Sequence, residues 1–204
     1  MVLSLFSVML MGLAVNWTAA ALLALANAFY VFVYTAWLKR RTPQNIVIGG
    51  AAGALPPMVG WAAVTGDVSL ASVVLFLIIV VWTPPHFWAL ALYRVDDYAR
   101  AGIPMLPVVA GLESTRRHIL GYTLALLPIS LLPLALGVSG ALYGAAAIVL
   151  GTGFVRHAFG LWRERTQRCA TRTFRYSITY LFGLFTAIVV DRVATVLIGG
   201  GPIW

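Results

Sequence analysis

Six apolar runs, each long enough to cross a lipid bilayer, set the strongest constraint on how this 204-residue chain folds. A helix needs roughly 20 apolar residues to span the hydrocarbon core. The period-2 alternation of a membrane barrel is absent, and 61% of the residues are hydrophobic while only 10% are charged. The sequence therefore predicts an all-α, polytopic membrane bundle with spans near 17–38, 44–65, 69–93, 115–137, 139–163 and 173–198.

A shorter apolar stretch, residues 2–15, precedes the first of these runs. It contains no Lys or Arg, which argues against a signal peptide, and it is too short for a full span. We therefore expect a shortened first helix, an N-terminally truncated chain, and one membrane domain over residues 1–204.

The basic residues fall in alternate connections between the runs. By the positive-inside rule these connections face the cytoplasm, so the net charge of +8 reflects topology and gives no reason to expect a nucleic-acid partner. The chain has one cysteine, Cys169, which falls in one of these connections. Because it is the single cysteine, a disulfide within the chain is excluded. The three groups are Lys39, Arg40 and Arg41; Arg94, Arg100, Arg116 and Arg117; and Arg163, Arg165, Arg168, Arg172 and Arg175.

The segment YTAWLKRRTPQN, residues 34–45, ends one run and opens the next. Cations at this position are explained by membrane orientation and by a favourable interaction with the helix C-terminus. They are followed, however, by a rigid proline turn and three polar side chains, the last of them Asn45. Converging cations and amide donors also suit a phosphate or diphosphate.

The segment WTPPHFWALALYRVDD, residues 82–97, carries a histidine inside an apolar run. Pro84 and Pro85 remove two backbone donors and predict a kink or a break in the helix. His86 lies about 12 Å inside the mouth at 1.5 Å per residue. It is either a hydrogen-bonded structural residue or a contact to a substrate metal such as haem iron. If the helix continues, one stripe contains Trp82, His86, Leu90, Tyr93 and Asp97.

Asp96 and Asp97 are two of only six acids in the chain and stand at the mouth of this run. Acids beside arginines are ordinarily solvated ion pairs. Adjacent carboxylates on the same side as a cationic loop also suit Mg²⁺, with substrate phosphate and water completing its shell. The residues alone therefore favour an intramembrane cavity that handles a phosphorylated lipid.

Two long segments, residues 34–66 and 82–109, resemble the protohaem IX farnesyltransferases (haem O synthases), a branch of the UbiA-type membrane prenyltransferases. The resemblance implies nine helices, of which this chain matches the last seven. It also implies Mg²⁺-dependent transfer of a farnesyl group from farnesyl diphosphate to a vinyl of haem B, on the way to haem A. The enzyme would lie in a bacterial plasma membrane with its active site on the cytoplasmic side, and a downstream haem A synthase would be a partner.

The resemblance also implies residue roles. Lys39, Arg40 and Arg41, with Arg94 and Asn45, would bind the diphosphate. Asp96 and Asp97 would be the catalytic acids and the magnesium ligands. Trp82, His86, Trp88 and Tyr93 would line the haem or prenyl pocket.

The sequence departs from the superfamily pattern at two places. Tyr93 stands where members that act on quinones carry an Asp, four residues before Asp97, and this favours the haem branch. The first acidic motif of the family is absent, so we expect the chain alone to be inactive. The alternatives are a prenyltransferase acting on a quinone or another aromatic acceptor, and a membrane transporter or channel subunit, whose inverted repeats are not evident.

Overall fold

The computed structural model describes residues 2–199, which fold into ten α-helices and one π-helix, η1, without a strand. The all-α prediction is confirmed. The elements are α1 (Val2–Ala14), α2 (Trp17–Ala28), η1 (Phe29–Leu38), α3 (Asn45–Ala54), α4 (Pro56–Thr65), α5 (Leu70–Tyr93), α6 (Val95–Arg100), α7 (Leu106–Val109), α8 (Gly111–Ala135), α9 (Ala141–Glu164) and α10 (Gln167–Gly199).

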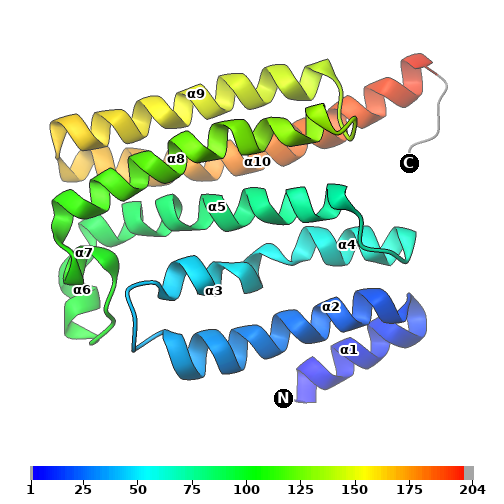
Figure 1. Ribbon diagram of the computed structural model, residues 1–204, viewed down its shortest axis with the longest axis horizontal. Helices are drawn as coiled ribbons and strands as arrows, with labels where there is room; N and C mark the ends of the chain where they lie inside the picture. The colour runs from blue at the N-terminus through cyan, green and yellow to red at the C-terminus, as the bar shows by residue number, and fades with distance from the viewer. Residues whose placement is uncertain (1, 200–204) are drawn as a thin grey trace.

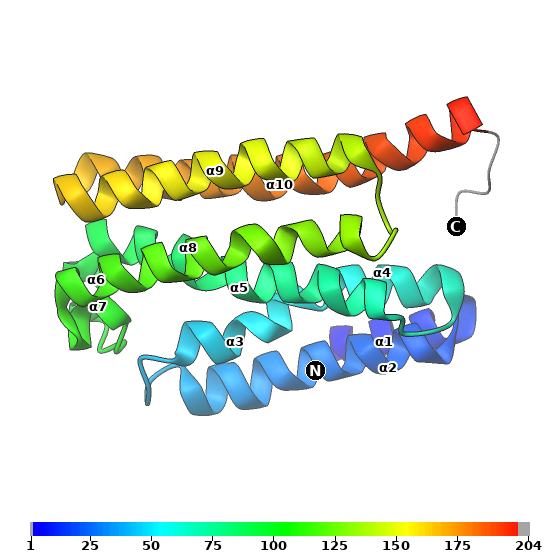
Figure 2. The ribbon, with the colours of Figure 1, turned by 45° about the horizontal axis from the view of Figure 1, so that its top comes forward.

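Helix α5 lies at the centre of the bundle (Figure 1). It packs against α8 and α10 on one side and against α3 and α4 on the other, while α9 covers α8 and α10 (Figures 1 and 2). One buried apolar cluster contains Ile46, Trp88 and Ile119, and a second contains Ile78, Phe154 and Tyr180. Together these clusters join α5 to α3 and to the three C-terminal long helices.

Six segments of the described chain are long and apolar enough to span a membrane, as predicted. Two of them begin earlier than expected: at Gly111 instead of residue 115, and at Gln167 instead of residue 173. Cys169 therefore lies in the first turn of α10 and is buried, so its assignment to a loop is wrong. The segments are Trp17–Leu38, Asn45–Thr65, Leu70–Tyr93, Gly111–Ala135, Ala141–Glu164 and Gln167–Leu197.

Two of the predicted spans are interrupted. The segment 44–65 divides at Leu55 into α3 and α4, because Pro56 and Pro57 cannot donate backbone hydrogen bonds but fit the first turn of a new helix. The segment 17–38 changes from α2 to the π-helix η1. A methyl group at Gly49 of α3 would overlap the ring of Tyr34, so the glycine permits η1 and α3 to pack closely.

Helix α5, in contrast, continues through Pro84 and Pro85, so the predicted break does not occur. Both prolines are buried among neighbouring helices, and the Thr83 hydroxyl donates to the Ile79 carbonyl at 2.7 Å. The helix ends at Tyr93, and Arg94 (φ −123°, ψ 23°) turns the chain into α6. The predicted stripe therefore stops at Tyr93 and does not include Asp97.

The three basic groups lie at one end of the bundle. The turn after η1, the short helices α6 and α7, and the α9–α10 turn all gather at the left end in Figure 1. The turns after α4 and α8 lie at the opposite end. We call the first the basic end and the second the opposite end.

Candidate functional site

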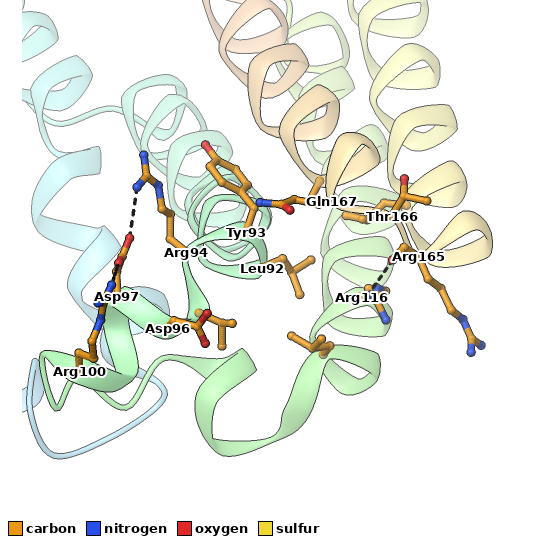
Figure 3. Close-up of a pocket in the computed structure, with 14 residues that line it drawn as sticks. Leu92, Tyr93, Arg94, Asp96, Asp97, Arg100, Arg116, Arg165, Thr166 and Gln167 are labelled. Carbon is orange, nitrogen blue, oxygen red and sulfur yellow. Dashed lines mark hydrogen bonds and ion pairs between the residues drawn. The ribbon is translucent and has the colours of Figure 1, made fainter.

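A polar pocket of about 540 Å³ opens at the basic end, where four elements meet around the start of α6. This volume is within the range of small-molecule sites. Figure 3 shows that its walls come from the end of α5, from α6, from the start of α8 and from the α9–α10 turn. Its polar lining consists of Tyr93, Arg94, Asp96, Asp97, Arg100, Arg116, Arg165, Thr166 and Gln167.

The two acids predicted from the sequence both line this pocket but differ in their contacts. Asp97 bridges two arginines, accepting from Arg100 at 2.5 Å and from Arg94 at 3.2 Å. These hydrogen bonds, Arg100 first and Arg94 second, hold the pKa of the Asp97 carboxyl below its usual value. Asp96 is exposed and, within the described chain, has no hydrogen bond or ion pair.

The donor set fits a magnesium ion that takes part of its shell from a substrate. Mg²⁺ binds one or two carboxylates and completes an octahedron with phosphate and water oxygens. Asp96 offers a free carboxylate, and Asp97 would have to exchange an arginine contact for the metal. Within residues 2–199, no three His, Cys, Asp or Glu side chains gather closely enough to form a metal site by themselves.

The residues predicted to bind diphosphate do not form one group. Arg94 lines the polar pocket, whereas Lys39, Arg40 and Arg41 lie in the turn after η1, beside α6 at the same end (Figures 1 and 2). Asn45 is buried, and its amide donates to the Lys39 carbonyl at 3.1 Å. Asn45 therefore fixes the turn that presents the cations instead of presenting its own side chain at the surface.

An apolar groove of about 520 Å³ runs along α4, α5 and α10. Three aromatic rings stack on its wall: Trp82 on His86 at 4.3 Å between centroids, and His86 on Phe174 at 4.7 Å. Tyr93, which lines the polar pocket, packs edge-on against Phe174 at 6.1 Å. This aromatic column of four residues therefore joins the polar pocket to the apolar groove.

The hydrogen bonds around Ser177 define which nitrogen of His86 carries the proton. The Ser177 hydroxyl donates to the Phe174 carbonyl at 2.6 Å, so the same oxygen accepts from His86 Nδ1–H at 2.7 Å. In the neutral ring, Nε2 then keeps its lone pair. The Trp82 indole donates to the Ser177 carbonyl at 2.8 Å and holds the column against α10.

Trp88 lies on a different face of α5 from His86 and lines neither the polar pocket nor the apolar groove, so its assignment to the haem or prenyl pocket stays a prediction. It is 2% exposed and packs edge-on against His118 and Tyr122 of α8, with ring centroids 5.9 and 5.3 Å away. Two residues after His86 on a helix, a side chain points to a different face. Trp88 belongs to the core.

Comparison with known proteins identifies the scaffold. The sequence model described as the UbiA prenyltransferase family matches residues 1–183. The chain belongs to this family. A solved structure described as digeranylgeranylglyceryl phosphate synthase in membranes superposes with a TM-score of 0.79, covering 93% of this chain and 66% of that one. At 19% identity this likeness shows the shared fold.

Curated relatives within the family are much more similar in sequence. The protein named protoheme IX farnesyltransferase from Parvibaculum lavamentivorans is 61% identical over 195 residues, covering 94% of this chain. A protein named protoheme IX farnesyltransferase 1 from Mesorhizobium japonicum is 56% identical over 199 residues, covering 95% of it. The chain spans 61% and 63% of the length of these two relatives. The resemblance to this branch is confirmed.

Sequence reasoning missed several polar residues of the pocket. Arg116, Arg165, Thr166 and Gln167 were treated only as part of the charge asymmetry or not at all. They lie about 20 to 70 residues beyond Asp97, and the fold brings them to it. Phe174 was missed for the same reason. One signal was available: α8 and α10 carry arginines inside or directly beside their apolar runs.

Proposed function

We propose that this protein transfers a farnesyl group from farnesyl diphosphate to a vinyl group of haem B, giving haem O and pyrophosphate. The observation that carries this proposal is the 61% identity, over 94% of the chain, to a relative named protoheme IX farnesyltransferase. Family membership favours prenyl transfer over a transporter or channel, and the names of the relatives favour a haem over a quinone as acceptor. We also propose that the basic end faces the cytoplasm of a bacterial cell.

The geometry supports binding of the two parts of farnesyl diphosphate in two places, the diphosphate at the basic end and the farnesyl chain in the apolar groove. The diphosphate would lie at the basic end, where the turn of Lys39, Arg40 and Arg41 and the side chains of Arg94 and Arg100 supply positive charge. The farnesyl chain would follow the aromatic column into the apolar groove. Charge and hydrophobicity would thus orient the allylic carbon near Tyr93.

Asp96 and Asp97 would hold Mg²⁺, which would neutralise charge on the departing pyrophosphate. The arginines would stabilise the same developing charge. As the C–O bond breaks, the faces of Tyr93, Phe174 and Trp82 would shield the allylic cation until the vinyl carbon forms the new C–C bond. The oxygen of a water molecule would then bond to the cationic carbon left beside the ring, and the released proton would go to solvent, which leaves a hydroxyl group on that carbon. His86, through its Nε2 lone pair, would contact the haem.

Conversion of haem B to haem O in membranes, with farnesyl diphosphate and with or without Mg²⁺, tests the proposal. The Parvibaculum lavamentivorans relative, with the matching substitutions, is assayed in parallel because it is the longer protein. Asp96→Asn is expected to lower turnover at least about tenfold, equivalent to 1.4 kcal/mol of transition-state stabilisation, because it removes the free carboxylate facing the metal.

The control is Asp67→Asn in the exposed turn after α4 at the opposite end, which should leave turnover unchanged. Formation of a prenylated quinone instead of haem O would contradict the proposed acceptor. Equal turnover of the Asp96 variant and its parent would contradict the proposed metal site.

A further inference from the structure

A groove of about 380 Å³ lies between α9 and α10, which pack side by side along one side of the bundle (Figures 1 and 2). Arg172, Arg175 and Thr179 of α10 line it, are exposed, and follow one another about one helical turn apart. His157 of α9 and Tyr176 of α10 complete its lining. We call it the outer groove. It shares no lining residue with the polar pocket or the apolar groove.

The two rings of the outer groove are held in place by stacking and by hydrogen bonds. The His157 ring stacks on Tyr176 with centroids 4.3 Å apart, and its Nδ1–H donates to the Gly153 carbonyl at 2.8 Å. The Tyr176 hydroxyl donates to the Leu150 carbonyl at 3.2 Å. A methyl group at Gly153 would overlap this hydroxyl, so the glycine makes room for the tyrosine. The arginines of α10 therefore flank a fixed aromatic wall.

No acid balances the charge of Arg172 and Arg175. Within the described chain neither side chain has a hydrogen bond or an ion pair, and no Asp or Glu lines the groove. Glu164 of α9 lies seven residues beyond His157, about 10 Å at 1.5 Å per residue, and accepts from the Cys169 thiol. The groove therefore presents two positive charges to an anion. The remaining acids are Asp96, Asp97 and Glu113 near the polar pocket, and Asp67 and Asp191 at the opposite end.

The outer groove lies at the level where the lipid headgroups are expected. Residues 176–190 of α10, directly after Arg175, carry no charge, and neither do residues 141–155 of α9, directly before Arg156. Arginines that border an apolar stretch lie at the membrane surface. Toward the opposite end the surface continues with exposed apolar side chains, among them Val149 (68%) and Phe182 (75%). A lipid with its phosphate in the groove can lay its acyl chains along this surface.

We propose that the outer groove binds the phosphate of an anionic phospholipid, with Arg172 and Arg175 donating to its oxygens. Basic pockets between membrane helices suit anionic headgroups, and an arginine can donate two parallel hydrogen bonds to one phosphate. A zwitterionic lipid also carries an ammonium group, for which no acid lines the groove in the described chain. This site is independent of the proposed prenyl transfer.

The test measures the affinity of the first bound lipid by native mass spectrometry of the purified 204-residue protein in detergent. Phosphatidylglycerol and phosphatidylcholine with identical acyl chains are compared, so that only the headgroup differs. The parent should bind phosphatidylglycerol more tightly. Arg172→Gln and Arg175→Gln should each weaken its binding about fivefold, the contribution of one arginine at a lipid surface. Both variants should bind phosphatidylcholine as the parent does.

Arg163→Gln is the matched control, because Arg163 is an exposed arginine of α9 at the same end that does not line the outer groove. It removes the same charge and should leave both affinities unchanged. An equal loss in this control and in the groove variants would overturn the inference, because general positive charge would then explain the binding. The unfolding midpoints of all three variants should match that of the parent, which separates loss of binding from loss of folding.

Two further outcomes would overturn the inference: equal binding of the two lipids by the parent, and unchanged phosphatidylglycerol binding in both groove variants. Inorganic phosphate is the second probe. It should not displace phosphatidylglycerol at equal concentration, because it has no acyl chains to lie on the apolar surface. Displacement would assign the groove to a soluble phosphate instead of a lipid.

Discussion

Aspartates at the two ends of the bundle differ in their exposure and in the groups that their carboxylates contact. At the opposite end, Asp191 of α10 is 4% exposed, and its carboxylate accepts hydrogen bonds from the backbone N–H groups of Gly140 and Tyr143. Gly140 has no side chain, so Asp191 supplies the missing N-terminal cap of α9. At the basic end, Asp96 is exposed without a partner and Asp97 contacts only exposed arginines.

This difference separates acids that stabilise the fold from acids whose carboxylates are available to bind a metal or a substrate. A carboxylate that satisfies buried backbone donors cannot leave them without cost. A carboxylate in an exposed ion pair contributes little to stability and can exchange its partner for a metal or substrate. The basic end is therefore the end where binding chemistry is available, and the opposite end is the one where an acid holds two helices together.

The largest expected effect concerns the orientation of the two ends. Cys169 is buried and its thiol donates to Glu164 at 3.0 Å, so labelling begins from a Cys169→Ser background. An impermeant thiol reagent should label Arg168→Cys only in inside-out vesicles and Asp67→Cys only in right-side-out vesicles. The reversed pattern would place the basic end outside, and labelling of both from one side would contradict the two-ended arrangement.

An intermediate effect is expected on stability. Asp191→Ala leaves two backbone donors of α9 without acceptors and should lower the free energy of unfolding by about 2–3 kcal/mol. The measurement is the unfolding midpoint of the purified protein in detergent. Asp67→Ala, an exposed acid at the same end, should change it by less than about 0.5 kcal/mol. Equal unfolding midpoints for the two variants would contradict the structural role of Asp191.

The smallest effect concerns Asp97. Arg100→Gln removes the main cause of its lowered pKa, so the pKa of Asp97 should rise toward its ordinary value, as followed by a carbon NMR titration of labelled aspartate. The pKa of Asp97 is lower in the folded protein than in the unfolded chain. Its ion pairs therefore stabilise the folded state at pH values above the unfolded-state pKa, and this stabilisation is lost as the pH falls through the folded-state pKa. Arg117→Gln should not move this titration. An unchanged titration in Arg100→Gln would contradict the ion pair.

Several features of the site could be predicted from neighbouring residues alone. The adjacent acids and the cationic turn after residue 38 are local patterns, and both lie at the basic end as the charge distribution indicates. The predictions failed where neighbouring helices overrode a local rule. A kink or a break was expected at Pro84 and Pro85, yet α5 continues without a break because it is packed on several sides.

Hydrophobicity and charge in the sequence determined the membrane class, the six spans and the common end of the basic loops, because a bilayer imposes the same length and charge rules on any chain. Which faces of the helices meet was decided only by the tertiary structure. Trp88 and His86 differ by two positions, but one enters the core and the other a groove. Arg116 and Arg165, 49 residues apart, share one wall of the pocket. Such pairings depend on how helices pack side by side, and no rule of local sequence fixes that packing.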